Sequence, residues 1–173
     1  MPPASYYSYL QVEDEEEGIF YQFITNYHIG YTVYFKLDEY SGFVNNFPLL
    51  LKKGYAFGFR QQKLDTHTKN VNDPLVLSTI YQIVLDFFMN HGNDAILLYH
   101  CDIADSRQSH RNRLFNNWEK RLLASDVVCK YSVEIQIGSH DFYLGFISLV
   151  ENPLLEEIKM EFEAFSYFII QPK

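Results

Sequence analysis

Three of the five arginines in this chain fall within seven residues, at Arg107, Arg111 and Arg113. They follow an apolar stretch that ends at Cys101, and the pattern predicts that a helix begins near Ser106. Guanidinium groups bind phosphates and carboxylates through paired hydrogen bonds, so arginines at this spacing could hold an anionic ligand. The whole chain has a net charge of −8, which makes this basic cluster the feature most in need of explanation.

The helix dipole makes such a cluster costly unless an anion lies nearby. Cations in the first turns are disfavoured by roughly 0.3–1 kcal/mol each, because that end of the helix carries a partial positive charge. Asp105 followed by Gln108 resembles a capping box, in which both side chains bind the first backbone N–H groups. Asp102 and Asp105 could brace the arginines from within, or an external phosphate or carboxylate could bind them. Both interpretations stay open, and we favour the internal brace.

Apolar residues on the same predicted helix, residues 106–124, explain how it docks. Phe115 and Trp118 are three residues apart, so they share one side of a helix and are expected to pack on the sheet. The arginines then flank this packing stripe. We define the arginine-rich segment as residues 102–118, and its candidate anion-binding or ion-pair residues are Asp102, Asp105, Arg107, Gln108, Arg111 and Arg113.

The stretch YHCDIADSRQSHRNRLFNNW resembles the signature of an uncharacterised family of small Bacteroidota proteins, a domain of unknown function. The signature has the approximate form C-D-x-x-D-x-R-Q-x-x-R-N-R-x-F-x-x-W. The matching residues are Cys101, Asp102, Asp105, Arg107, Gln108, Arg111, Asn112, Arg113, Phe115 and Trp118. Ser106 stands where the family usually has glycine, and Ser109 and His110 replace alanines. The resemblance covers most of the chain and implies a compact intracellular bacterial domain, but it supplies no activity.

Other kinds of catalytic chemistry find little support in the sequence. His100, Cys101 and Asp102 are consecutive, but a strand would project Cys101 to the face opposite the other two, which disfavours a nucleophilic dyad. The six histidines show none of the HxH, HxxxH or HExxH spacings of metal sites, and no glycine-rich phosphate loop is present. We therefore assign no catalytic residue, no metal site and no cofactor.

The elements that must position the arginine-rich segment follow from hydrophobic periodicity. Asp73 with Pro74, and Asn152 with Pro153, are typical helix starts, and Gly92 is a typical helix end. Strands are predicted over 19–26, 30–37, 54–61, 95–101, 130–137 and 141–150, and helices over 74–91, 106–124 and 153–170. The order β-β-β-α-β-α-β-β-α predicts an α+β fold, with a mostly antiparallel sheet of about five or six strands and three helices packed on it.

Two helices have apolar residues at helical spacing. The first predicted set is Leu77, Ile80, Tyr81, Val84, Leu85 and Phe88, and the second is Leu155, Ile158, Phe162, Phe165 and Ile169. Residues 1–17 are predicted to form an acidic, flexible leader, and residues 18–173 a single α+β domain. The acidic run from Glu13 to Glu17 fits a solvated leader, or an arm that meets a basic patch or partner.

Composition and charge narrow the classes of function. The net charge of −8 argues against nucleic acid as a partner, and no apolar run is long enough to span a membrane. The first residues do not predict a secretory signal, and Cys101 and Cys129 are expected to be reduced, buried thiols, so we expect the protein in the cytoplasm. The sequence favours a non-enzymatic binding or regulatory module with an anionic ligand or a protein as partner. The alternative is an enzyme or sensor for a phosphate- or carboxylate-bearing small molecule.

Overall fold

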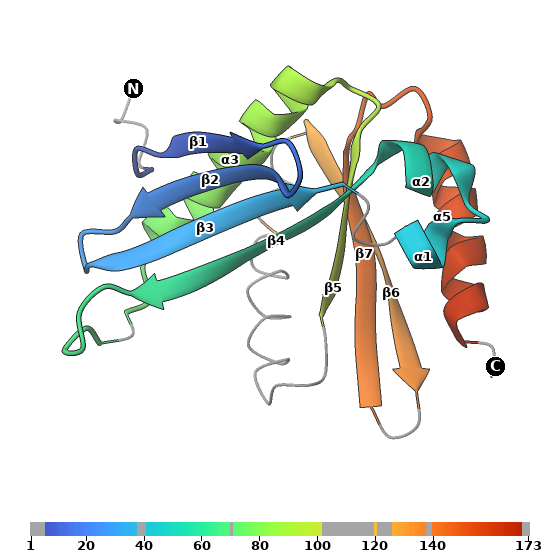
Figure 1. The fold of residues 1–173 in the computed structure, drawn as a ribbon. Coiled ribbons are helices and arrows are strands. Elements are labelled where there is room, and N and C mark those ends of the chain that lie inside the picture. Colours follow the sequence, from blue (N-terminus) through green and yellow to red (C-terminus); the bar gives the residue numbers. More distant parts are fainter. Residues whose placement is uncertain are drawn as a thin grey trace. The chain divides into compact units, whose positions relative to one another are not determined.

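The computed structural model describes residues 6–37, 41–69, 71–101, 120, 126–137 and 140–170. Seven strands form a mostly antiparallel sheet in the order β1-β2-β3-β4-β5-β7-β6 (Figure 1). β4 and β5 pair in parallel, whereas β1–β2, β2–β3, β5–β7 and β6–β7 are antiparallel pairs. The predicted α+β class is confirmed, with more strands than the five or six expected. Backbone contacts divide the chain into two compact units, Met1–Leu37 with Phe57–His91 and Asp38–Ala56 with Gly92–Lys173.

The first unit is a set of antiparallel strands with one long helix. Its elements are β1 (Leu10–Asp14), β2 (Gly18–Ile24), β3 (Ile29–Lys36), most of β4 (Gly54–Lys63) and α3 (Pro74–His91). The predicted hairpin is confirmed, because β2 and β3 pair in antiparallel register with Phe23 opposite Tyr31. β1 lies within residues 1–17, which were predicted to be a leader before the first strand. The division into a leader, 1–17, and a single domain, 18–173, stays a prediction.

Helix α3 begins and ends as its sequence predicts. An Asp73 carboxylate oxygen accepts the N–H of Leu75 at 3.0 Å, and Gly92 has a φ of +96°, the left-handed region that favours glycine. The buried face of α3 coincides only in part with the predicted set of apolar residues. Ile80, Val84 and Phe88 are buried as expected, whereas Leu77, Tyr81 and Leu85 are half-buried. The other buried residues of α3 are Val76, Thr79, Ile83 and Phe87.

Aromatic stacking holds α3 on one face of the strands in this unit. The rings of Phe35 on β3 and Phe87 on α3 are stacked with centroids 4.1 Å apart, and both side chains are fully buried. Tyr21 on β2 meets Phe35 edge-on at 5.7 Å. Such aromatic pairs add about 0.5–1.5 kcal/mol beyond the burial of their area.

The second unit contains the arginine-rich segment and begins with two helices that the sequence did not predict. Its elements are α1 (Ser41–Val44), α2 (Pro48–Lys53), the start of β4, β5 (Ile96–Cys101), β6 (Val128–Ile137), β7 (His140–Leu149) and α5 (Leu155–Ile170). The predicted strand pair is confirmed by the antiparallel ladder between β6 and β7, in which Tyr131 lies opposite Phe146. Helix α5 follows Asn152, whose side-chain oxygen accepts the N–H of Leu154 at 2.9 Å.

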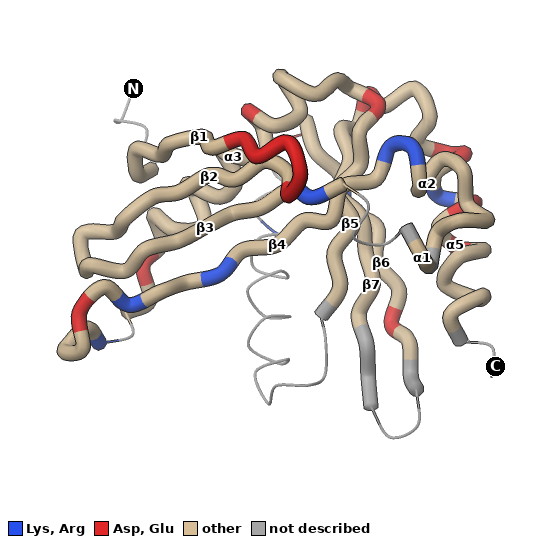
Figure 2. The backbone as a smooth tube through the Cα atoms, viewed as in Figure 1, with Lys and Arg blue, Asp and Glu red and all other residues tan. Residues whose placement is uncertain are grey.

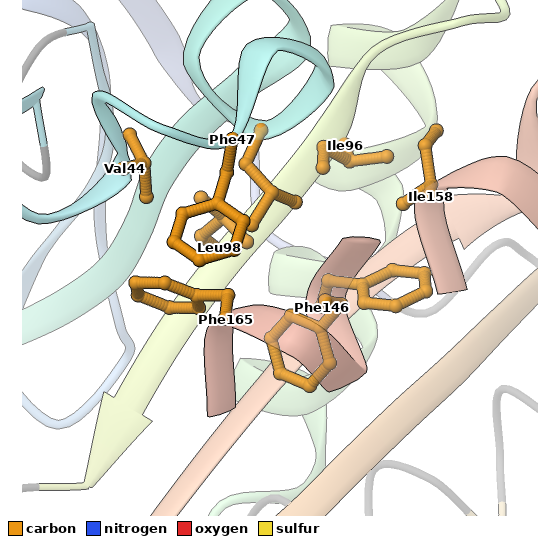
Figure 3. Close-up of a cluster of buried hydrophobic side chains, with 9 residues drawn as sticks. Val44, Phe47, Ile96, Leu98, Phe146, Ile158 and Phe165 are labelled. Carbon is orange, nitrogen blue, oxygen red and sulfur yellow. The ribbon is translucent and has the colours of Figure 1, made fainter. Parts of the chain in front are cut away.

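The core of the second unit lies between α1, α2, α5 and one face of β5 and β7 (Figure 3). Ile158, Phe162 and Phe165 of α5 are buried there, and Leu155 and Ile169 pack against the cluster, so the predicted apolar stripe is confirmed. The buried cluster is Val44, Phe47, Leu50, Ile96, Leu98, Phe146, Ile158, Phe162 and Phe165.

A carboxylate on α5 caps the start of α2. The two oxygens of Glu161 accept the N–H groups of Leu49 at 3.1 Å and Leu50 at 3.0 Å. Phe47, at the N-cap position, makes no side-chain cap bond, so Glu161 takes the place of a local capping residue. The negative charge also suits the positive end of the helix dipole. This contact ties α2 to α5 across more than a hundred residues of sequence.

We predict that Glu161→Ala lowers the free energy of unfolding by about 1–2 kcal/mol, because two N–H groups lose their acceptor. Urea denaturation measures the change. Glu157→Ala is the matched control, since Glu157 is an exposed residue of the same helix and its replacement should change stability by less than about 0.5 kcal/mol. Equal losses in the two variants would contradict the capping role.

A second packing constraint joins β5 to β7. A Cβ atom on Gly145 would lie 2.2 Å from the hydroxyl oxygen of Tyr99, so the tyrosine ring occupies the space that a side chain would need. Tyr99 is buried and cannot move aside easily. A Cβ atom on Gly58 would likewise lie 2.2 Å from the hydroxyl oxygen of Tyr34, but Tyr34 is only half-buried.

We predict that Gly145→Ala destabilises the protein by about 1–3 kcal/mol, through overpacking against Tyr99. Gly58→Ala should cost less, because the half-buried Tyr34 ring can turn toward solvent. Urea titrations of the two variants give the comparison. A larger loss for Gly58→Ala would show that burial of the tyrosine does not decide the cost.

Candidate functional site

The arginine-rich segment lies outside the described residues, and so does the rest of the predicted helix 106–124 except Lys120. The predicted site and packing residues that fall there are Asp102, Asp105, Arg107, Gln108, Arg111, Arg113, Phe115 and Trp118. Their roles stay predictions. The structure does define the element that leads into them.

Strand β5 carries the chain to the first residue of the segment. Its residues 96–99 are all buried, and it pairs in parallel with β4 and in antiparallel register with β7. The prediction of an interior strand over 95–101 is confirmed. The strand ends at Cys101, so the segment that begins at Asp102 follows it directly. Residues 96–98 pair with both β4 and β7, and residues 99–101 pair with β7, so the segment begins at the end of a strand that β7 holds over its full length.

Polar residues occupy the same end of the neighbouring strands. Cys101 lies opposite Tyr143 on β7, and Tyr143 lies opposite Glu134 on β6. The Tyr143 hydroxyl donates to a Glu134 carboxylate oxygen at 3.5 Å, the long limit of a hydrogen bond. Glu134 is exposed, and so is His100 on β5. The Tyr143 phenol and the Glu134 carboxylate thus lie on the face of the sheet that Cys101 shares, whereas His100, one residue earlier on β5, lies on the opposite face.

Cys129 is a free, half-buried thiol on β6. Burial raises the pKa of this thiol, while the ammonium of Lys159 acts in the opposite direction and is the smaller effect. The thiol therefore stays protonated at neutral pH, and a protonated thiol is a poor nucleophile. Its environment fits a packing role.

The first unit contains two tyrosine–carboxylate pairs that the sequence did not predict. The Tyr7 hydroxyl donates to Asp73 at 2.6 Å, and the Tyr9 hydroxyl donates to Asp86. The N–H of Tyr7 also donates to the hydroxyl oxygen of Thr79 at 2.9 Å. The hydroxyls and carboxylates are 66 and 77 residues apart in the chain, so no local pattern could have revealed them. Together they fasten residues 7–9 to α3.

These pairs act as structural hydrogen bonds rather than as acid–base groups at neutral pH. Burial raises the pKa of Tyr9 well above its usual value, and the hydrogen bond to Asp86 raises it further. The pKa of Tyr7 is raised by the same two causes, with Asp73 as its partner. Both phenols keep their protons until the solution is strongly alkaline.

We predict that Tyr9→Phe lowers the free energy of unfolding by about 1–2 kcal/mol at pH 8, since Asp86 loses a donor. A phenol whose pKa is raised by folding stabilises the fold below the unfolded value of about 10, and this contribution is lost as the pH rises through the folded pKa. The difference between the original protein and Tyr9→Phe should therefore shrink above about pH 10. Urea titrations at pH 8 and about 10.5 measure it.

Tyr167→Phe is the control for this pH dependence, because Tyr167 is exposed on α5. Its unfolding free energy should follow that of the original protein at both pH values. A Tyr9→Phe difference that grows with pH would contradict the assignment.

Two further findings concern metals and membranes. Within the described ranges, no three or more histidine, cysteine, aspartate or glutamate side chains come together in a way that could hold a metal ion. In the same residues, no helix has the length and apolar character needed to cross a membrane.

The described elements define the class of this protein as an α+β domain with a mostly antiparallel sheet. Residues 72–164, more than half of the chain, match the model of a family of unknown function, DUF6169, and the chain belongs to this family. The predicted membership of an uncharacterised family is confirmed. No curated protein matches the chain, and no solved structure matches it.

Proposed function

We propose that this chain is a non-enzymatic binding or regulatory module of the bacterial cytoplasm. The sequence favours an internal brace for the arginine-rich segment, but a binding module needs a contact surface, and we propose that this segment is the contact surface for an acidic partner. The observation that carries the proposal is the position of Arg107, Arg111 and Arg113 directly after the buried strand β5. A contact surface needs a rigid support, and β5, which pairs with β7 over its full length and with β4 at residues 96–98, provides one.

The extent of the family match supports this assignment. Residues 72–164 include α3, β5, the arginine-rich segment, β6, β7 and most of α5, whereas β1, β2 and β3 precede them. The segment therefore lies within the part of the chain that the family model matches. The bacterial source follows from the resemblance of the segment to a Bacteroidota signature.

The chemistry of the segment indicates the kind of partner. Arginine forms two parallel hydrogen bonds with a carboxylate or a phosphate, so three arginines in seven residues suit a surface rich in such groups. Repulsion by the rest of the chain, with its net charge of −8, would oppose a partner whose negative charge is spread widely. A short acidic stretch of a protein fits better than a nucleic acid. The cytoplasmic assignment is supported by the free thiol of Cys129.

Thermal unfolding in the presence of anions tests the proposal. The probes are a ten-residue glutamate peptide, inorganic phosphate, pyrophosphate and ATP. We expect the glutamate peptide to raise the melting temperature of the original protein, and a ligand at about 100 times its dissociation constant adds about 2.7 kcal/mol. The effect should be lost in Arg107→Ala and Arg111→Ala. It should persist in Arg60→Ala, because Arg60 is an exposed arginine on β4.

The outcomes separate the proposal from its alternatives. A larger response to phosphate, pyrophosphate or ATP than to the peptide would favour an enzyme or sensor for an anionic small molecule. If no anion changes the melting temperature and both alanine variants are destabilised, the arginines serve as an internal brace on Asp102 and Asp105. Equal loss of the peptide effect in Arg60→Ala would show that the binding is not specific to the segment.

A further inference from the structure

Strand β1 forms one end of the sheet order, and its outer side pairs with no strand among the described residues. Figure 1 shows β1 at the edge of the strands, and every residue from Leu10 to Asp14 is exposed. An edge strand presents unpaired backbone N–H and C=O groups, which can pair with an extended segment of another chain. β1 is held in place by its antiparallel pairing with β2 and by the hydrogen bond from Tyr9, the residue before it, to Asp86 on α3.

An apolar strip accompanies this edge. Leu10 lies opposite Gln22, and Val12 lies opposite Phe20, so the alternation of side chains puts Leu10, Val12, Phe20 and Ile24 on one face, the outward face. The opposite face of β2 carries Ile19, Tyr21 and Phe23, which are buried. On the outward face, 75% of Leu10, 49% of Val12 and 59% of Ile24 is exposed. Natural edge strands are usually blunted by charges, which β1 carries at one end, at Glu13 and Asp14. The exposed apolar residues before them are typical of a binding surface.

The acidic turn, residues 13–17, continues from β1 into β2 (Figure 2). All five side chains are exposed, and an Asp14 carboxylate oxygen accepts the N–H groups of Glu16 at 2.9 Å and Glu17 at 3.1 Å. Gly18 follows with a φ of +122°, and a Cβ atom there would lie 2.5 Å from the carbonyl oxygen of Phe35. The backbone thus displays the carboxylates at a fixed end of the edge.

We propose that the outer edge of β1 is a docking surface for an extended segment of a partner protein, in which apolar residues alternate with lysine or arginine. The segment adds a strand to β1, its apolar side chains cover Leu10 and Val12, and its basic side chains pair with the acidic turn. This surface lies within the first unit.

The charge of the edge favours a basic segment over a second copy of the chain or a nucleic acid. Five carboxylates lie in residues 13–17. Lys36, at the neighbouring end of β3, has a single charge of opposite sign, and its ammonium lies 5.4 Å from the centre of the Tyr34 ring. A second copy that paired through its own β1 would bring five more carboxylates to the same edge, and a nucleic acid would bring phosphates. A basic segment is the occupant whose charge complements the edge.

Binding of a labelled peptide of alternating lysine and valine, followed by fluorescence anisotropy, tests the proposal. We expect saturable binding at low salt that weakens at about 0.3 M salt. Replacing Glu15, Glu16 and Glu17 by glutamine should weaken binding about tenfold, and so should Leu10→Thr with Val12→Thr. The matched control replaces the exposed Glu151, Glu156 and Glu157 by glutamine, which removes the same charge elsewhere, and it should bind like the original protein.

Backbone pairing is tested by two further measurements. The same peptide methylated on alternate backbone nitrogens should lose binding, because it cannot complete the ladder. Hydrogen exchange of the β1 amides should slow when the unmodified peptide binds. The proposal is overturned if the peptide does not bind, if the methylated peptide binds equally, or if the control variant loses as much affinity. It is also overturned if the protein is a dimer that Leu10→Thr with Val12→Thr dissociates, since a second copy then occupies the edge.

Discussion

The second unit depends on the burial of β5 on both of its faces. Ile96 and Leu98 face the core formed with α5, while Leu97 and Tyr99 on the other face are also buried. A shift of the pairing by one residue would exchange the two faces and place the Tyr99 ring away from the gap left by Gly145. The register of β5 is therefore strongly specified. The position at which the arginine-rich segment leaves the strand follows from that register.

Carboxylates give both units contacts between residues that are distant in sequence. Glu161 caps α2 from α5, Asp94 pairs with Lys53, and Asp73 and Asp86 accept the phenols of Tyr7 and Tyr9. Acidic residues thus supply acceptors for hydrogen bonds within each unit, in addition to the exposed carboxylates of residues 13–17. A carboxylate that accepts a backbone or phenol donor holds a segment in one place, and an exposed carboxylate such as those of residues 15–17 is available to a partner.

The sequence predicted the elements with strong periodicity and the helix ends with local capping. Asp73, Gly92 and Asn152 occupy their expected roles because caps depend on a few neighbouring residues. β1 was not predicted because a strand with five exposed residues has no buried face to create alternation. Helix α2 was not predicted because its cap, Glu161, comes from another helix. The candidate site was predicted from residue type alone. Hydrogen-bonded pairs such as Tyr9 with Asp86 could not be predicted, because the two residues are far apart in the sequence.

The central claim is that the arginine-rich segment starts from a rigid strand and acts as a contact surface for an acidic partner. Hydrogen–deuterium exchange with and without the glutamate peptide tests it most directly. We expect the amides of residues 96–98 in β5 to exchange slowly in both conditions, because these residues pair with both β4 and β7. The amides of residues 102–118 should exchange more slowly when the peptide is present. Unchanged exchange in residues 102–118 at saturating peptide, or rapid exchange in β5, would contradict the account.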